Sequence, residues 1–140
     1  MTLTPEQLKQ AMNVWTQRLS LRDWHIRVSI NRSYELGENT EANCSVTEKL
    51  KRARIRLLDP LDWPRYSEDE QDHEQALVHE LLHIPTWRFM PSYDTDESAY
   101  ILYEQFIDQL ATALVDLGRV IKPIKRSVRV KPKVQSPQSQ

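Results

Sequence analysis

Residues 75–85 of the chain read QALVHELLHIP. Within this stretch His79 and His83 are four positions apart, so on a helix their rings lie one above the other and can reach one ion. The apolar residues that surround them are Leu77, Val78, Leu81, Leu82 and Ile84. Two buried histidines beside a glutamate are destabilising without partners. The stretch therefore predicts a largely buried helix that carries a metal site.

The segment from His79 to His83 has the H-E-x-x-H pattern. Neutral imidazole is a natural ligand of Zn²⁺, and a catalytic zinc site has three protein ligands and leaves one position for water. Glu80 is rotated to the side of the histidine pair, where we expect it to take a proton from that water as the general base. The pattern thus predicts hydrolysis of a peptide bond without a covalent intermediate.

The third metal ligand must come from outside this segment, because no histidine follows His83. The last predicted helix offers two candidate carboxylates, Glu97 and Glu104. Glu97 fits a capping box that starts at Asp94, which gives it a structural role. Glu104 lies on an otherwise apolar stripe at helical spacing, where a buried carboxylate needs a cation. We therefore expect Glu104 to be the third ligand, with Asp108 either orienting a metal-bound histidine or exposed to solvent.

The remaining sequence predicts an α+β fold. A capping box at Thr4 starts a helix that continues to about Ser20. Alternating apolar and polar residues predict strands at 24–30 and 53–57, and a further strand is expected at 42–48. These strands should form a small, mainly antiparallel sheet of three or four strands.

The helix that carries the histidine pair has start and stop signals of its own. Ser67 to Glu70 forms a second capping box, which predicts that the helix begins there. Pro85 predicts that it ends near Ile84, because proline disfavours helical geometry in the preceding residue.

The last predicted helix completes a single domain over residues 1–118. Asp94 or Thr95 can cap it, and Gly118 predicts its end after Leu117.

The charge is distributed unevenly along the chain, although the net charge is only −1. Residues 119–140 contain no acidic side chain, and their basic residues are Arg119, Lys122, Lys125, Arg126, Arg129, Lys131 and Lys133. The proline, serine and glutamine at the end favour a disordered tail. Such a tail can contact nucleic acid, an acidic partner or the domain itself.

The composition also indicates in which cellular compartment the protein is expected. No stretch approaches the roughly 20 apolar residues that a membrane span requires, and no secretory signal is visible. The single cysteine, Cys44, cannot form an internal disulfide, which agrees with a reducing compartment. We therefore expect a cytoplasmic protein without a membrane partner. With only two glycines, a Gly-rich phosphate-binding loop is excluded.

Taken together, these motifs resemble the gluzincins, the class of metallopeptidases that includes thermolysin. In that class H-E-x-x-H is completed by the glutamate of an E-x-x-x-D sequence on the next helix, a pattern that Glu104 and Asp108 match. The order of elements over residues 5–117 is also similar to that of minimal zincin-type metallopeptidases encoded by phages and bacterial genomes. The resemblance implies a polypeptide substrate. It also implies His79, His83 and Glu104 as zinc ligands and Glu80 as the base.

Two other functions stay open at this point. The zinc site could stabilise a small domain or bind a partner without catalysis. Glu80 argues against this, because a purely structural site needs no base. Alternatively, the chain resembles the SprT-like, nucleic-acid-associated proteases, with the basic tail binding nucleic acid. No zinc ribbon of cysteines accompanies the histidine pair, which argues against that version.

Other histidine, cysteine and tyrosine residues are weaker candidates for a role in the chemistry. His73 is predicted to face solvent. Cys44 can be a ligand only if the fold places it beside His79. The tyrosines Tyr93, Tyr100 and Tyr103 are either core residues or donors to an oxyanion.

Overall fold

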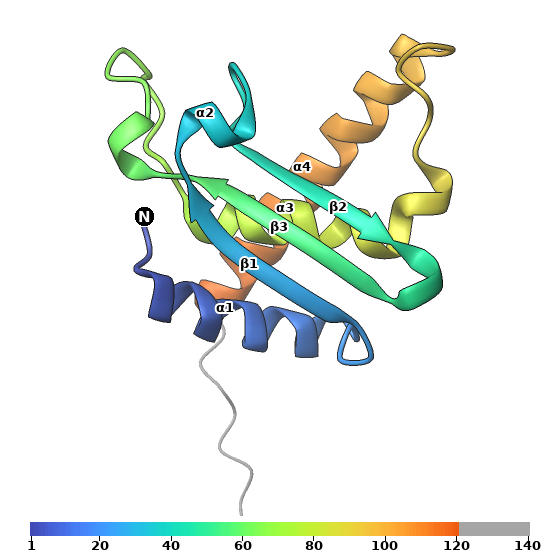
Figure 1. Ribbon diagram of the computed structural model, residues 1–140, viewed down its shortest axis with the longest axis horizontal. Coiled ribbons are helices and arrows are strands. Elements are labelled where there is room, and N and C mark those ends of the chain that lie inside the picture. Colours follow the sequence, from blue (N-terminus) through green and yellow to red (C-terminus); the bar gives the residue numbers. More distant parts are fainter. Residues whose placement is uncertain (121–140) are drawn as a thin grey trace, which may run out of the picture.

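The computed structural model describes residues 1–120 and confirms the predicted α+β class. Its elements are, in chain order, α1 (Pro5–Arg18), β1 (His25–Asn31), α2 (Ser33–Leu36), β2 (Ala42–Thr47), η1 (Glu48–Leu50), β3 (Arg52–Leu58), η2 (Pro60–Asp62), α3 (His73–Thr86), η3 (Trp87–Phe89) and α4 (Glu97–Val120) (Figure 1). Among these residues, none of the helices combines the length and the apolarity that crossing a membrane requires.

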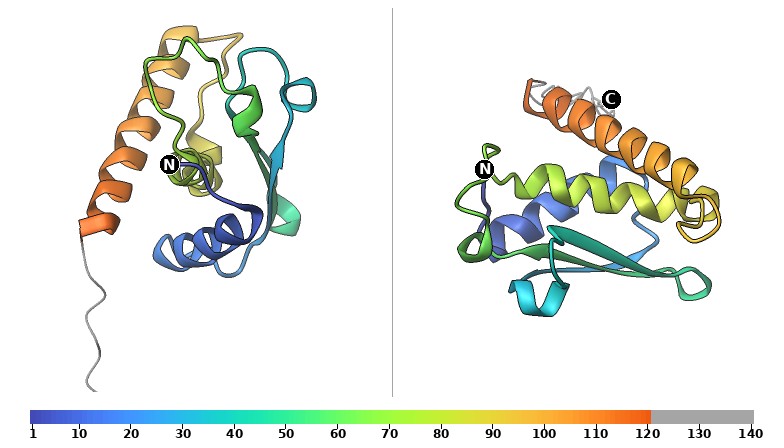
Figure 2. Two further views of the ribbon diagram at one scale, coloured as in Figure 1. Left: turned by 90° about the vertical axis from the view of Figure 1, so that its left-hand side faces the viewer. Right: turned by 90° about the horizontal axis from the view of Figure 1, so that it is seen from above.

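The elements are stacked in layers (Figure 2). Helices α1 and α3 cover one face of the three-stranded sheet, and α4 packs on the side of α3 that is turned away from the sheet. In the part of the chain that the structure describes, the other face of the sheet carries no helix of comparable length (Figure 1). Helix α3 is therefore buried between two layers, which explains why Leu77, Val78 and Leu81 are fully buried.

The sheet is mixed, whereas the sequence predicted a mainly antiparallel one. Strand β3 lies in the centre, pairing with β1 in parallel and with β2 antiparallel. The central place of β3 fits its composition, since Ile55 and Leu57 are completely buried. The parallel pair arises because the chain crosses from β1 to the far edge before β3 returns between the two strands.

Helix α3 begins and ends later than the sequence predicted. Its N-cap is Asp72, whose carboxylate accepts hydrogen bonds from the backbone N–H groups of Glu74 and Gln75 at 3.1 and 3.2 Å. The predicted capping box at residues 67–70 lies in the preceding loop. Pro85 lies inside the last turn, where its missing N–H removes a single intrahelical bond.

Helix α4 also differs from the prediction at both ends. Asp96 caps it, accepting a hydrogen bond from the Ala99 N–H at 3.0 Å. The helix continues through Gly118 to Val120 instead of ending at Gly118. Glycine is needed there for close packing, because a Cβ at this position would lie 3.2 Å from the Trp15 ring and 2.8 Å from the Arg18 guanidinium.

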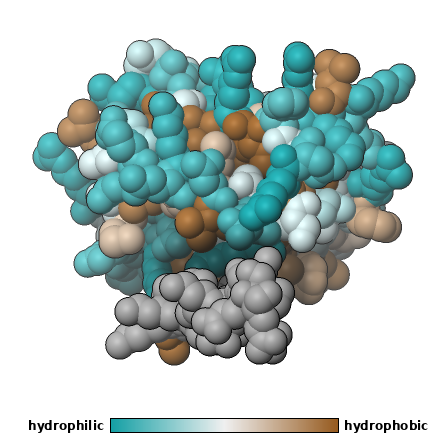
Figure 3. Space-filling model, turned by 90° about the horizontal axis from the view of Figure 1, so that it is seen from below, coloured by the Kyte–Doolittle hydropathy of each residue, from teal (hydrophilic) through white to brown (hydrophobic). Residues whose placement is uncertain are grey.

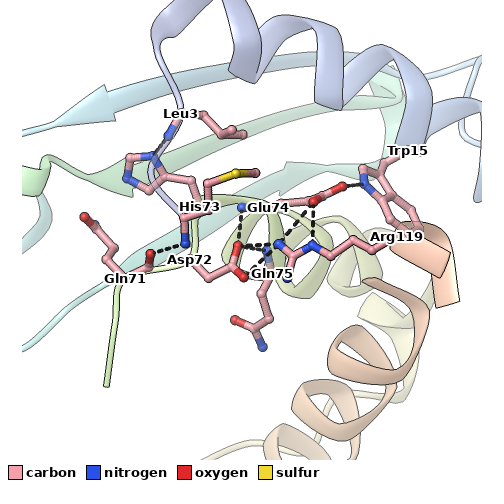
Figure 4. A network of polar contacts seen from close by, with 9 residues as sticks. Leu3, Trp15, Gln71, Asp72, His73, Glu74, Gln75 and Arg119 are labelled. Atoms are coloured by element: carbon pink, nitrogen blue, oxygen red, sulfur yellow. Dashed lines mark hydrogen bonds and ion pairs between the residues drawn. The ribbon is translucent and has the colours of Figure 1, made fainter. Parts of the chain in front are cut away.

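His73 is buried, so the prediction that it faces solvent was wrong. Only 1% of its surface is exposed, because it lies where the N-terminal segment meets the start of α3. Its Nδ1 accepts the Leu3 N–H at 3.0 Å (Figure 4). Its Nε2 donates to the Leu58 carbonyl at 3.0 Å. Partners distant in the sequence therefore satisfy this histidine, and it is not one of the three grouped candidate ligands.

Arg119 links helices α3 and α4, although the sequence assigned it to the tail. Its guanidinium forms ion pairs with Asp72 at 2.8 Å and with Glu74 at 3.2 Å. Glu74 also accepts a hydrogen bond from the Trp15 indole at 2.9 Å, which brings α1 into the same network (Figure 4). The rest of the predicted tail, residues 121–140, lies outside the described residues.

Candidate metal centre

The structure brings the three predicted ligands together. His79 and His83 come from α3 and Glu104 from α4, and one ligand atom of each lies within 4.8 Å of the other two. The His79 Nε2 is 3.1 Å from Glu104 Oε2, and the His83 Nε2 is 3.5 Å from Glu104 Oε1. Both imidazoles thus point the same nitrogen at a single carboxylate.

The positions of these side chains follow from the packing of the two helices. On α4 the stripe of apolar residues faces α3, and Ile107, Ala111 and Val115 on it are fully buried. Glu104 continues that stripe one turn before Ile107, so it is directed at α3 as well. Its side chain is 28% exposed, at the point where the helix interface opens into a cavity.

The Nδ1 atom of His79, on the side of the ring away from Glu104, contacts a second carboxylate. It lies 3.4 Å from Asp108 Oδ1, one turn beyond Glu104 on α4. Asp108 in turn accepts a hydrogen bond from the Gln75 side chain at 2.8 Å. Such a partner fixes the orientation and tautomer of a metal-binding histidine and leaves Nε2 free to coordinate. The structure thus places Asp108 where the orienting role requires it.

His83 has an equivalent partner that the sequence did not reveal. The Tyr103 hydroxyl lies 2.9 Å from the His83 Nδ1 and 2.7 Å from the Thr86 hydroxyl. The Thr86 hydroxyl also donates to the Leu82 carbonyl of α3 at 2.6 Å, which fixes the position of the Thr86 side chain beside Tyr103. Tyr103 is therefore positioned to orient His83, and its hydroxyl is not directed at the cavity as an oxyanion donor would be.

We predict that Tyr103→Phe lowers the zinc affinity about tenfold, because loss of an outer partner lets the ligating imidazole rotate. Competition with a chromophoric chelator measures the change. The matched control is Tyr93→Phe, since that hydroxyl donates to Glu97 away from the three ligands. Equal zinc affinities for the two variants would contradict the orienting role of Tyr103.

Glu80 lines the cavity that contains the three ligands. This cavity has a volume of about 580 Å³, and its walls come from α3, α4 and residues 39–44 of the sheet edge. Only 7% of Glu80 is exposed, and burial raises the pKa of its carboxyl to about 7. The charge of Glu104 acts in the same direction, while His79 opposes it. A carboxyl with this pKa can both accept and release a proton near neutral pH.

The pKa values of the three ligands reflect their mutual contacts. Burial works against protonation of His79, but the hydrogen bond to Glu104 and the neighbouring carboxylates outweigh it and raise the pKa of His79. Burial also lowers the pKa of His83. Burial raises the pKa of Glu104, but the two histidines outweigh burial and hold this pKa below its ordinary value. Negative charge therefore collects where both Nε2 atoms converge.

The fold places Cys44 beside the site. It lies on β2, on the side of the strand that faces α3, and it lines the same cavity as His79 and Glu80. Burial and the charge of Glu80 raise the pKa of the Cys44 thiol to about 12. A thiol with such a pKa stays protonated and is a poor metal ligand. Cys44 thus contributes to the wall of the cavity and is not one of the grouped ligands.

Glu97 lies apart from the grouped ligands. Its carboxylate accepts a hydrogen bond from Tyr93 at 3.1 Å, and the residue is exposed at the start of α4. It is not part of the predicted capping box, since Asp96 caps the helix. Of the two carboxylates that the sequence offered, only Glu104 joins the histidines.

The set of donors fits zinc. Two neutral imidazole nitrogens and one carboxylate oxygen form the ligand set of catalytic zinc sites, which keep a further position for water. Each imidazole has its outer nitrogen occupied by Asp108 or Tyr103, so its inner nitrogen is free to coordinate. The adjoining cavity gives room for a substrate.

The chain matches no protein-family profile, and neither curated proteins nor solved structures give a significant match. Its function is therefore inferred from the residues of the site themselves.

Proposed function

We propose that this protein hydrolyses peptide bonds with a zinc ion bound by His79, His83 and Glu104. The observation that carries the proposal is the convergence of both Nε2 atoms on one carboxylate, within 4.8 Å, at the wall of an open cavity. A structural zinc site is normally closed by four protein ligands, whereas three ligands beside a cavity are typical of a catalytic site.

Zinc held in such a site supplies a Lewis acid, which lowers the pKa of a water molecule and polarises a peptide carbonyl. Glu80 provides the group that moves the proton. Its carboxylate accepts a proton from the attacking water and can then deliver it to the leaving amine. Burial favours this exchange, since the pKa of about 7 keeps both protonation states accessible at neutral pH.

The edge of the sheet supports a polypeptide substrate. Among residues 1–120, strand β2 pairs only with β3, so within this part of the chain its outer edge presents unpaired backbone N–H and C=O groups. Residues 39–44, which include the start of this strand, form one wall of the cavity that contains Glu80. An extended peptide that pairs with this edge would bring a backbone carbonyl towards the site. The sequence predicts the cytoplasm as the place where this hydrolysis occurs.

Glu80 also favours hydrolysis over a zinc site without catalysis. Only 7% of Glu80 is exposed, and burial disfavours the charged form of its carboxyl. An apolar side chain at this position would stabilise the folded protein more than the carboxyl does. The retained carboxyl is explained if it acts on a water molecule.

We predict that the protein binds one zinc ion per chain and becomes more stable when it does. The ligands come from two helices that meet only after folding, so binding energy contributes to folding stability. At free zinc about 100 times the dissociation constant, the melting temperature should rise by about 10 °C. Elemental analysis and thermal melts, each with and without chelator, measure both quantities.

The pH dependence of zinc binding provides a second readout. Zinc must displace any proton on His79, whose pKa is raised above that of an ordinary histidine. The apparent affinity should therefore fall as the pH is lowered from about 8 to about 6. If the protein retains no metal after incubation with excess zinc, and its melting temperature is unchanged, the proposed site is contradicted.

A further inference from the structure

The bare face of the sheet is rich in arginine. Side chains of a strand alternate between its two faces, so the residues opposite the helices can be read from the register. They are His25, Arg27, Ser29 and Asn31 on β1, Arg52, Arg54 and Arg56 on β3, and Asn43, Ser45 and Thr47 on β2. None of the three strands contains an aspartate or a glutamate. This arginine face is therefore positively charged along β1 and β3, and β2 adds only uncharged polar side chains to it.

The arginines lie next to one another without carboxylate partners. Arg27 and Arg54 are directly paired across β1 and β3, and Arg52 precedes Arg54 by two residues on the same face. Like charges in directly opposite positions destabilise a sheet. Within residues 1–120, none of these three guanidinium groups lies within ion-pair distance of an acidic side chain. A bound anion would relieve this repulsion.

One end of the arginine face is hollowed. The hollow has a volume of about 700 Å³, and its lining includes Arg27, Arg52 and Arg54 together with the hydroxyl groups of Ser45 and Thr47. Such groups donate hydrogen bonds to phosphate oxygens. The exposed ring of His25, which lies opposite Arg52 on the same face, also lines the hollow. An aromatic ring beside guanidinium groups offers a base a surface on which to stack.

The two sides of the molecule have opposite charge. The acidic residues of α3 and α4 are Glu74, Glu80, Glu97, Glu104, Asp108 and Asp116, with Arg119 as their basic residue. These helices lie beyond the other face of the sheet (Figure 2). In Figure 3, which views the molecule from below, hydrophilic side chains project from the upper border. The charge separation orients a polyanion towards the sheet and away from the metal centre.

We propose that the arginine face binds the phosphate backbone of a single-stranded nucleic acid. A duplex would be read by an element that enters a groove, and among the described residues 1–120 neither a long helix nor a hairpin projects from this face (Figure 1). A shallow sheet with paired arginines, hydroxyl donors and one aromatic ring fits an unpaired strand. This surface is distinct from the basic tail and does not depend on the proposed hydrolysis.

The test is the binding of a fluorescently labelled single-stranded DNA oligonucleotide to the full chain, followed by anisotropy over a range of salt concentrations. The variant Arg27→Gln/Arg54→Gln should bind about tenfold more weakly at low salt. The slope of log affinity against log salt concentration should also become shallower by about 1.4, because each of the two lost phosphate contacts removes about 0.7 from the slope. Its melting temperature should not fall, because the replaced pair is repulsive.

The matched control is Arg18→Gln/Arg65→Gln, which removes the same charge from α1 and from the loop before α3. This variant should keep nearly all of the affinity, and the basic tail is present equally in both proteins. Equal losses in the two variants would overturn the proposal, since only the net charge would then matter. Equally strong binding of polyglutamate or of duplex DNA would also overturn it, by assigning the face to another partner.

Discussion

Replacing Glu80 by glutamine is expected to lower the rate of peptide hydrolysis by about a thousandfold while the zinc content stays unchanged. The amide has almost the same shape but cannot accept a proton from water. Glu80 lies in the cavity wall and is not one of the grouped ligands, so its replacement leaves the three donors in place. Cleavage of an unfolded polypeptide with a fluorescent label, together with elemental analysis, measures both effects.

The control for this experiment is Glu97→Gln, which makes the same chemical change at an exposed position on α4. Its hydrolysis rate should match that of the unmodified protein. If Glu80→Gln cleaves as fast as this control, Glu80 is not the base. If neither the variants nor the unmodified protein cleaves any substrate while all bind zinc, the site holds metal without catalysis.

Replacing Glu104 by alanine is expected to lower the zinc affinity by more than about 100-fold, which exceeds the loss expected for an outer partner. The change removes the carboxylate on which both imidazole Nε2 atoms converge, at 3.1 and 3.5 Å. Alanine favours helix, and Glu104 lies within α4, so the helix itself should persist. Chelator competition gives the affinity, and circular dichroism checks the helix content.

The matched control is Glu97→Ala, because Glu97 is the other carboxylate that the sequence offered as a ligand. It is exposed and contacts Tyr93, so its loss should leave the zinc affinity unchanged. A structure of the zinc complex should place a Glu104 oxygen about 2.0–2.2 Å from the metal. Zinc retained in Glu104→Ala and lost in Glu97→Ala would show that the third ligand has been misassigned.

The sequence alone was sufficient for the features that depend on local periodicity. The spacing of four residues between His79 and His83 predicts a shared helix face, and in the structure both rings point at one carboxylate. The apolar stripe on the last helix likewise singled out Glu104 over Glu97. Alternation located β1 and β3, which begin at His25 and Arg52, next to the predicted starts at 24 and 53. The further expected strand, β2, begins at the predicted residue, Ala42.

The sequence was less informative where a residue depends on a distant partner. His73 looked exposed because nothing near it in sequence explains its burial, but its Nδ1 accepts a hydrogen bond from a residue 70 positions away. Tyr103 becomes an orienting group only because α4 crosses α3 close to His83. Asp72 caps α3, although the capping-box pattern in the sequence predicted a start at residues 67–70.

The tertiary structure alone decided the pairing of the strands and the surfaces that follow from it. Alternation predicts which side chains share a face, but it does not specify which strand lies in the centre. The parallel alignment of β1 with β3 is what places Arg27 opposite Arg54, and the edge position of β2 is what brings Cys44 beside Glu80. The physical reason is that helical and strand periods are set by neighbouring residues. Contacts between elements depend instead on how their buried faces pack once the whole chain has folded.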